Sequence, residues 1–89
     1  PQQQFPVKWP NHPTIALAYM DQIQREGQAV VGDVELRKAL KNAQSHLFSE
    51  VSDPLLGDQI LELADDISAY DTRSRALKEV LGGIALALQ

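Results

Sequence analysis

Residues 69–75 read AYDTRSR, and this stretch decides between two helical folds. Apolar and small residues run through it as one stripe whose spacings alternate between three and four, as in a heptad seam. No glycine or proline interrupts residues 61–81, so one helix over 54–88 is a solution, ~50 Å long at 1.5 Å per residue. The stripe consists of Leu56, Ile60, Leu63, Ile67, Tyr70, Ser74, Leu77, Leu81, Ile84 and Leu88.

The other solution places a chain break inside this stretch, because Asp71 or Thr72 can cap a new helix. Four helices then follow one another, near residues 13–31, 33–50, 54–70 and 72–88. Helices of matched length with short connections are typical of an antiparallel four-helix bundle. We predict this all-α fold, also because helices average about eleven or twelve residues. The long helical hairpin with 54–88 as one helix is the alternative.

Local signals indicate where the other helices begin and end. In "SDP", Asp53 is a cap and Pro54 takes the first helical position. Pro13 suits the first turn of the first helix, with Asn11 or His12 as its cap. Asp33 is the expected cap of the second helix. The first helix ends at one of two glycines, Gly27 or Gly32.

The apolar stripes predict which side chains form the core of the domain. The set is drawn from three of the expected helices and faces one side of each. We expect these residues to be largely buried: Leu40, Leu47, Ile60, Leu63, Ile67, Leu77 and Leu81.

The N-terminal stretch PQQQFPVKWPNHP holds four of the five prolines. Proline fixes φ, donates no hydrogen bond and disfavours helix in the residue before it. We therefore predict an extended arm over residues 1–12, ahead of one helical domain over residues 13–89. Phe5 and Trp9 either fold back into a groove between helices or dock on another chain, where tryptophan is a frequent anchor.

The C-terminal stretch VLGGIALALQ carries no charge from Val80 to Leu88. One stripe of it faces the core, and Val80, Gly82, Gly83 and Leu86 lie off that stripe. Either the helix frays near the glycines or these residues form an interface. The predicted partner-binding residues are Phe5, Trp9, Val80, Gly82, Gly83 and Leu86.

Composition excludes several classes of function. The 89 residues make one domain, and the absence of cysteine excludes disulfides and thiolate metal sites. Twelve acidic against eight basic residues give a net charge of −4, which disfavours nucleic acid as a partner. The apolar run at the C-terminus is too short for a membrane span of about twenty residues. We expect a cytoplasmic protein, with export after processing left open.

No pattern of residues indicates chemistry. The only histidines are His12 and His46, and no histidine pair has the spacing of metal ligands. We therefore predict no catalytic, metal-binding or cofactor-binding residue, no cofactor, no enzyme activity and no small-molecule substrate. Two charged groups are interpreted as solvated helix faces: the acidic ladder Asp58, Glu62, Asp65 and Asp66, and the basic cluster Arg37, Lys38 and Lys41.

Two families share features with this sequence. The stretch SDPLLGDQILELADDISAYDTRSRALKEVLGGIALALQ resembles the layout of type III secretion needle subunits, which implies a long C-terminal helix and self-assembly. This sequence departs from that layout because it has a proline-rich arm and an extra helix before the hairpin. The stretch VELRKALKNAQSHL and the helix lengths resemble small bacteriocin immunity proteins, which are antiparallel four-helix bundles. The acidic balance departs from that pattern, and we assign the chain to neither family.

The function expected from these features is protein binding without catalysis. An adaptor, a small chaperone and an immunity-type protein all fit that expectation, with a protein partner or a homo-oligomer as the bound species. The runner-up is a self-assembling structural subunit that resembles a type III secretion needle hairpin. A small helical metal-binding protein or enzyme is third.

Overall fold

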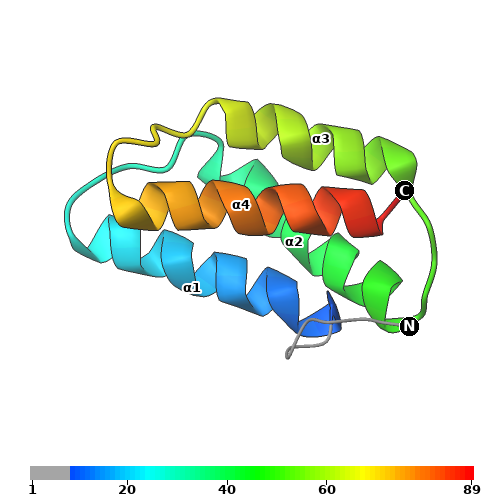
Figure 1. Ribbon diagram of the computed structural model, residues 1–89. Coiled ribbons are helices and arrows are strands. Elements are labelled where there is room, and N and C mark those ends of the chain that lie inside the picture. Colours follow the sequence, from blue (N-terminus) through cyan, green and yellow to red (C-terminus); the bar gives the residue numbers. More distant parts are fainter. Residues whose placement is uncertain (1–8) are drawn as a thin grey trace.

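A computed structural model describes residues 9–89, which form an antiparallel four-helix bundle as predicted (Figure 1). The elements are the 3₁₀ turn η1 (Trp9–Asn11) and four helices, α1 (His12–Arg25), α2 (Asp33–Phe48), α3 (Pro54–Asp65) and α4 (Thr72–Ala87). Helix α4 lies between α1 and α3 and packs against both, while α2 contacts α1 and α3. Each helix therefore runs antiparallel to the helices beside it.

The long-helix alternative is wrong, because the chain leaves the helix after Asp65 and enters the next at Thr72. The Ser74 N–H donates to Asp71 Oδ1 over 2.8 Å, so Asp71 caps α4 and satisfies one of its free amides. Ile67 is buried although it lies in the connection, outside any helix. Burial of Ile67 and the cap at Asp71 together favour the turn over a continuous helix.

The first helix ends at Arg25, just before Gly27, so the earlier of its two predicted ends is the one observed, and the helix does not continue to residue 31. Gly27 has a φ of +88°, in the left-handed region that glycine adopts without steric cost, and the chain turns there. Val30 is buried from the connection, so the apolar pattern continues past the end of the helix. The cap of α2 is Gly32, at φ +73°, and not Asp33, whose carboxylate accepts from Arg37 Nε instead.

Other helix ends agree with their sequence signals to varying degrees. Asp53 caps α3 as predicted, accepting the Leu56 N–H over 3.1 Å. Asn11 precedes α1 without a side-chain cap bond. The predicted extended arm is wrong for residues 9–12, since Trp9–Asn11 is a 3₁₀ turn and His12 begins α1. Phe5 and the rest of residues 1–8 lie outside the described residues.

The core contains all but one of the predicted side chains. Leu63 is the exception: it packs against the core but is only partly buried, and its Cδ2 lies 2.9 Å from the position that a Cβ on Gly32 would take. The side chains confirmed as buried are Leu40, Leu47, Ile60, Ile67, Leu77 and Leu81.

Candidate functional site

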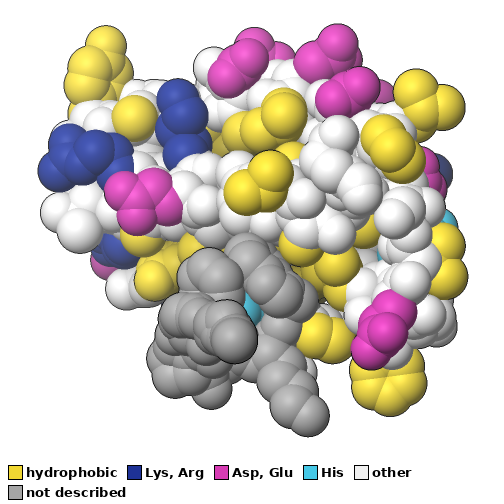
Figure 2. Space-filling view, turned by 45° about the vertical axis from the view of Figure 1, so that its right-hand side comes forward, with side chains coloured by type: hydrophobic (Ala, Val, Ile, Leu, Met, Phe, Trp, Pro, Cys, Tyr) yellow, Lys and Arg dark blue, Asp and Glu magenta, His cyan; other side chains and the backbone are white. Residues whose placement is uncertain are grey.

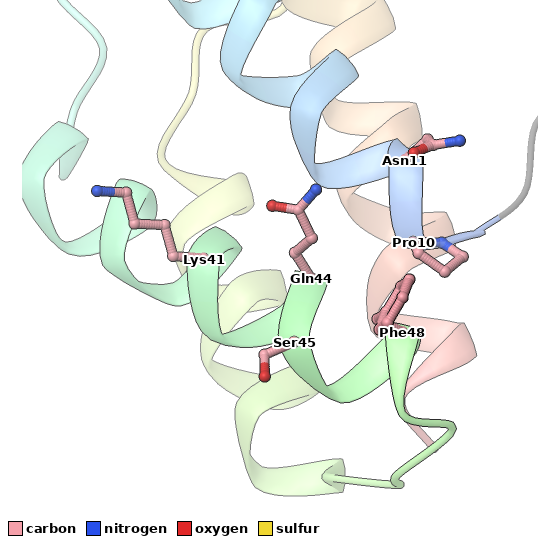
Figure 3. A pocket seen from close by; sticks show the side chains of 6 residues that line it. All are labelled: Pro10, Asn11, Lys41, Gln44, Ser45 and Phe48. Atoms are coloured by element: carbon pink, nitrogen blue, oxygen red, sulfur yellow. The ribbon is translucent and has the colours of Figure 1, made fainter.

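A shallow hollow of about 410 Å³ lies between η1 and the C-terminal half of α2. Figure 3 shows the Phe48 ring beside Pro10, while Lys41 and Ser45 point away from that pair. The hollow is open to solvent, and most of its lining residues are exposed. Ligand pockets enclose most of their ligand, so this shape argues against a small-molecule site.

The lining of the hollow includes one exposed aromatic side chain. The side chain of Phe48 is 79% exposed. A single exposed ring in an open hollow is an ordinary surface feature and gives no basis for assigning a ligand.

Two contacts fix how α3 and α4 lie against each other. The Asp53 N–H donates to the Leu88 carbonyl over 2.7 Å, which holds the start of α3 to the end of α4. One turn further on, Gly57 faces Ala85: a Cβ on Gly57 would lie 2.9 Å from the Ala85 carbonyl oxygen. Each step forward along α3 therefore stands level with one step backward along α4, so Leu61 stands level with Val80 and Leu81, and Gly82 lies one to two residues further along α4.

The solvent side of this pair of helices is here called the α3–α4 face. On each helix a stripe of four residues points outward from the α3–α4 seam, with spacings of four, three and four. Gly57 and Ala85 mark the side of each helix that faces the seam. Because each residue turns an α-helix by about 100°, the residues on the solvent side of that contact can be counted from these two positions. The stripes are Pro54, Asp58, Leu61 and Asp65 on α3, and Arg75, Glu79, Gly82 and Leu86 on α4.

The centre of the α3–α4 face combines exposed leucines with a bare stretch of backbone. Leu86 is 73% exposed and Leu61 is 42% exposed. A Cβ added to Gly82 would meet nothing within 4 Å, so packing inside the bundle does not require glycine there. Glycine inside a helix costs roughly 0.5–1 kcal/mol relative to alanine. The molecule therefore carries a helix-destabilising residue at an open surface position without an internal reason.

Acidic side chains line the α3 side of this face. Asp58, Glu62, Asp65 and Asp66 are exposed and, within residues 9–89, take part in no ion pair. Figure 2 shows acidic groups gathered along the upper edge over α3 and basic groups at the left, near the start of α4, with hydrophobic side chains between them. The face therefore has a negative side and a positive corner.

Elsewhere the acidic residues are mostly paired within the bundle. Arg37 bonds Asp21 of α1 over 2.7 Å and Asp33 over 2.8 Å, and the Asp21 bond is the main reason that the pKa of Arg37 is raised. Arg73 pairs with Glu26, which raises the pKa of Arg73 and ties α4 to the end of α1. Of the predicted basic cluster, Arg37 thus serves the fold, and only Lys38 and Lys41 are exposed.

The structure separates the predicted partner-binding residues. Gly82 and Leu86 share the α3–α4 face, with Gly83 half-buried beside them. Val80 is partly buried against the core, on the side of α4 that carries Arg73 and its α1 partner. Trp9 lies in η1, which packs against α2 and α1, and Phe5 lies outside the described residues.

Three residues of the α3–α4 face were not among the partner-binding residues predicted from the sequence: Leu61, Asp65 and Arg75. Leu61 and Asp65 lie four and eight residues after Gly57 on α3, but that spacing indicates a face only once Gly57 is known to lie in the seam. Their relation to α4 depends on which helix packs beside α3, and that is a property of the tertiary fold.

His46 lies between a backbone carbonyl and a carboxylate. His46 Nδ1 lies 2.6 Å from the Asn42 carbonyl oxygen, which can only accept, and Nε2 lies 3.3 Å from Asp53 Oδ2. Both ring nitrogens thus face backbone or carboxylate oxygens, and no serine hydroxyl bonds to either. Over residues 9–89 no three His, Cys, Asp or Glu side chains gather as a metal site. The absence of enzyme activity stays a prediction.

Among the same residues, no helix has both the length and the apolar character needed to cross a membrane. No protein-family model, curated protein or solved structure matches the sequence. The α3–α4 face is therefore the feature from which we infer the function.

Proposed function

We propose that this chain is a non-enzymatic protein-binding domain and that the α3–α4 face is its binding surface. The observation that supports it most is Gly82, a glycine in the interior of α4 whose missing side chain faces open space. Binding of a second protein would explain the glycine, because the backbone of that protein approaches α4 more closely where no side chain is present.

The rest of the face fits the same role. Leu61 and Leu86 flank the bare backbone and supply apolar area that a partner would remove from water, at roughly 25 cal/mol per Å². Asp58 and Asp65 stand at the edge, where charged groups remain partly solvated and contribute mainly to orientation and specificity. An apolar centre with a polar rim is the usual layout of a protein interface.

Two leucine variants provide a test. Leu86 and Leu55 are similarly exposed, at 73% and 81%, but only Leu86 lies on the face, since Leu55 is two residues before Gly57 and points about 160° away from the α3–α4 seam. Glutamine at each position keeps the helix propensity high and adds no charge. Wild type, Leu86→Gln and Leu55→Gln would be immobilised and exposed to an extract of the native cells and, separately, to the free wild-type chain.

We expect the bound protein, identified by mass spectrometry, to be retained by wild type and Leu55→Gln and lost by Leu86→Gln. Equal retention by all three chains would contradict the assignment of the face. A wild type that retains no cellular protein and also stays monomeric in free solution to about 1 mM would contradict the protein-binding function itself.

A further inference from the structure

We propose that the α3–α4 face binds a second copy of this chain, in a two-fold dimer whose axis runs parallel to the helices. This inference rests on the proposed function and names the partner. Three observations support it: the matched spacing of the two stripes, the register of α3 against α4, and the opposite charges at corresponding levels.

The geometry of such a dimer follows from the seam within one chain. Rotation by 180° about an axis parallel to the helices does not change the position of any residue along that axis. It places α4 of the second copy opposite α3 of the first. The two helices run antiparallel, at the register that the Asp53–Leu88 bond and the Gly57–Ala85 contact fix within each chain. Both copies then use the same surface, as a closed two-fold interface requires.

At that register the stripes interdigitate. The Cα of Leu61 lies one to two residues from the level of Gly82 of the second copy. A helical side chain leans toward the N-terminus of its own helix, so the half-exposed leucine faces the bare backbone. Leu86 falls between Pro54 and Asp58 of the second copy. The symmetry repeats both contacts, and each leucine is packed between positions of the facing helix in the manner of a knob in a hole.

Charge selects this orientation over the other face-to-face arrangement. With the axis parallel to the helices, Asp65 lies near Arg75 of the second copy, and both residues are exposed and free of ion pairs within the described chain. An axis across the helices would place α3 on α3, with Asp58, Glu62 and Asp65 against the same carboxylates. Like charges placed opposite each other across an interface are unfavourable.

Glu79 is the one residue of the two stripes that opposes this pattern. It stands between the levels of Leu61 and Asp65 of the second copy, so one carboxylate approaches another. Arg75, four residues earlier on the same helix, is positioned to offset it. Removal of the Glu79 charge should therefore strengthen the association of the two copies.

The size of the face limits the affinity. Helices of 12 and 16 residues are about 18 Å and about 24 Å long, and they lie side by side at about 8–10 Å. Such a footprint belongs with the small, transient interfaces that bury less than about 1,200 Å² in total. We expect a dimer that dissociates in the micromolar to millimolar range.

Sedimentation equilibrium across that range tests the proposal. Wild type and the control Leu55→Gln should approach the dimer mass at the highest concentrations, and Leu86→Gln should dissociate at least about tenfold more readily, which corresponds to about 1.4 kcal/mol. Glu79→Gln should associate more tightly than wild type. Circular dichroism would verify that every variant remains folded.

Charge reversal tests the register. Asp65→Arg and Arg75→Asp should each weaken association, and the double variant Asp65→Arg/Arg75→Asp should restore it. A folded wild type that stays monomeric to about 1 mM, or a double variant weaker than both single variants, would overturn the dimer. A monomer that still captures a cellular protein through Leu86 would overturn this inference and leave the proposed function standing.

Discussion

Gly57 and Gly82 lie on neighbouring helices, and their surroundings are opposite. Gly57 is buried in the α3–α4 seam, where a Cβ would lie 2.9 Å from the Ala85 carbonyl oxygen. Gly82 lies on the outside of the same pair of helices, where a Cβ would meet nothing within 4 Å. Both residues cost helix stability relative to alanine, but only Gly57 has a reason for it within the bundle.

The difference shows how a glycine in a helix can be assigned to folding or to binding. A glycine needed for folding lies against a neighbouring element of its own chain, as Gly57 does. A glycine that lies at an open surface, beside exposed leucines, has no partner within its own fold. The two sides of the α3–α4 pair therefore respond differently to substitution, and the following predictions test that difference from the largest effect to the smallest.

The inner and outer leucines of α4 should differ most. Leu81 is fully buried, and Leu81→Ala should lower the free energy of unfolding by about 2–5 kcal/mol, because it leaves a cavity as well as losing transfer energy. Leu86→Ala, on the outer side, should change it by less than about 0.5 kcal/mol in dilute solution. Urea denaturation measures both, and a similar loss for the two variants would refute the division of α4 into inner and outer sides.

The two glycines should respond to alanine with opposite signs. Gly57→Ala brings a methyl group against a backbone oxygen, and overpacking of this kind typically costs about 1–3 kcal/mol. Gly82→Ala meets nothing and should raise the unfolding free energy of the monomer by up to about 1 kcal/mol. Thermal denaturation at low concentration provides the comparison. Stabilisation by Gly57→Ala would mean that the seam is looser than described.

A third kind of glycine position occurs where the backbone itself requires it. Gly27 and Gly32 have positive φ, and Glu50 adopts the same region at +58° after the end of α2. Glycine is the usual residue at that position, because a side chain there is strained. Glu50→Gly should therefore stabilise the domain by about 0.5–1 kcal/mol in chemical denaturation. Gly27→Ala, the matched control at a positive φ, should instead destabilise it.

The cap of α4 should make stability depend on acid pH. The Ser74 N–H bond lowers the pKa of Asp71, so its ionised form is favoured in the folded state. That contribution is complete above the ordinary aspartate pKa of about 3.9 and is lost as pH falls through the lower folded value. Asp71→Asn removes the charge and keeps a capping side chain, so its deficit relative to wild type should shrink on acidification. A deficit that stays constant in a pH series of denaturation curves would show that the charge does not contribute.

The sequence predicted the bundle because its strongest signals are local. Asp53 and Asp71 were both recognisable as caps, and each accepts the amide three residues later in the structure. The apolar spacing was less decisive, because it continued unbroken through Tyr70 and permitted a long helix. Ile67 kept its place in the core from a connecting segment, which helical periodicity does not reveal.

The binding face was predictable only in part. Gly82, Gly83 and Leu86 were identified because they lie off the core stripe of their own helix. Val80 is also off that stripe, but it turns toward α1 and packs against the core. Leu61 and Arg75 were out of reach, since their place on the face depends on the register between two helices. The role of Gly57 was missed for the same reason, because its close neighbour Ala85 is far away in the sequence.

The central claim is that the bare backbone at Gly82 receives a side chain of another molecule. Its most direct test is an isotope-filtered NOE experiment on an equal mixture of labelled and unlabelled chains near the dissociation constant. The account predicts a contact between the Leu61 methyl groups of one chain and the Gly82 α-protons of the other. A dimer whose intermolecular contacts map to another face, or the absence of any intermolecular contact, would contradict it.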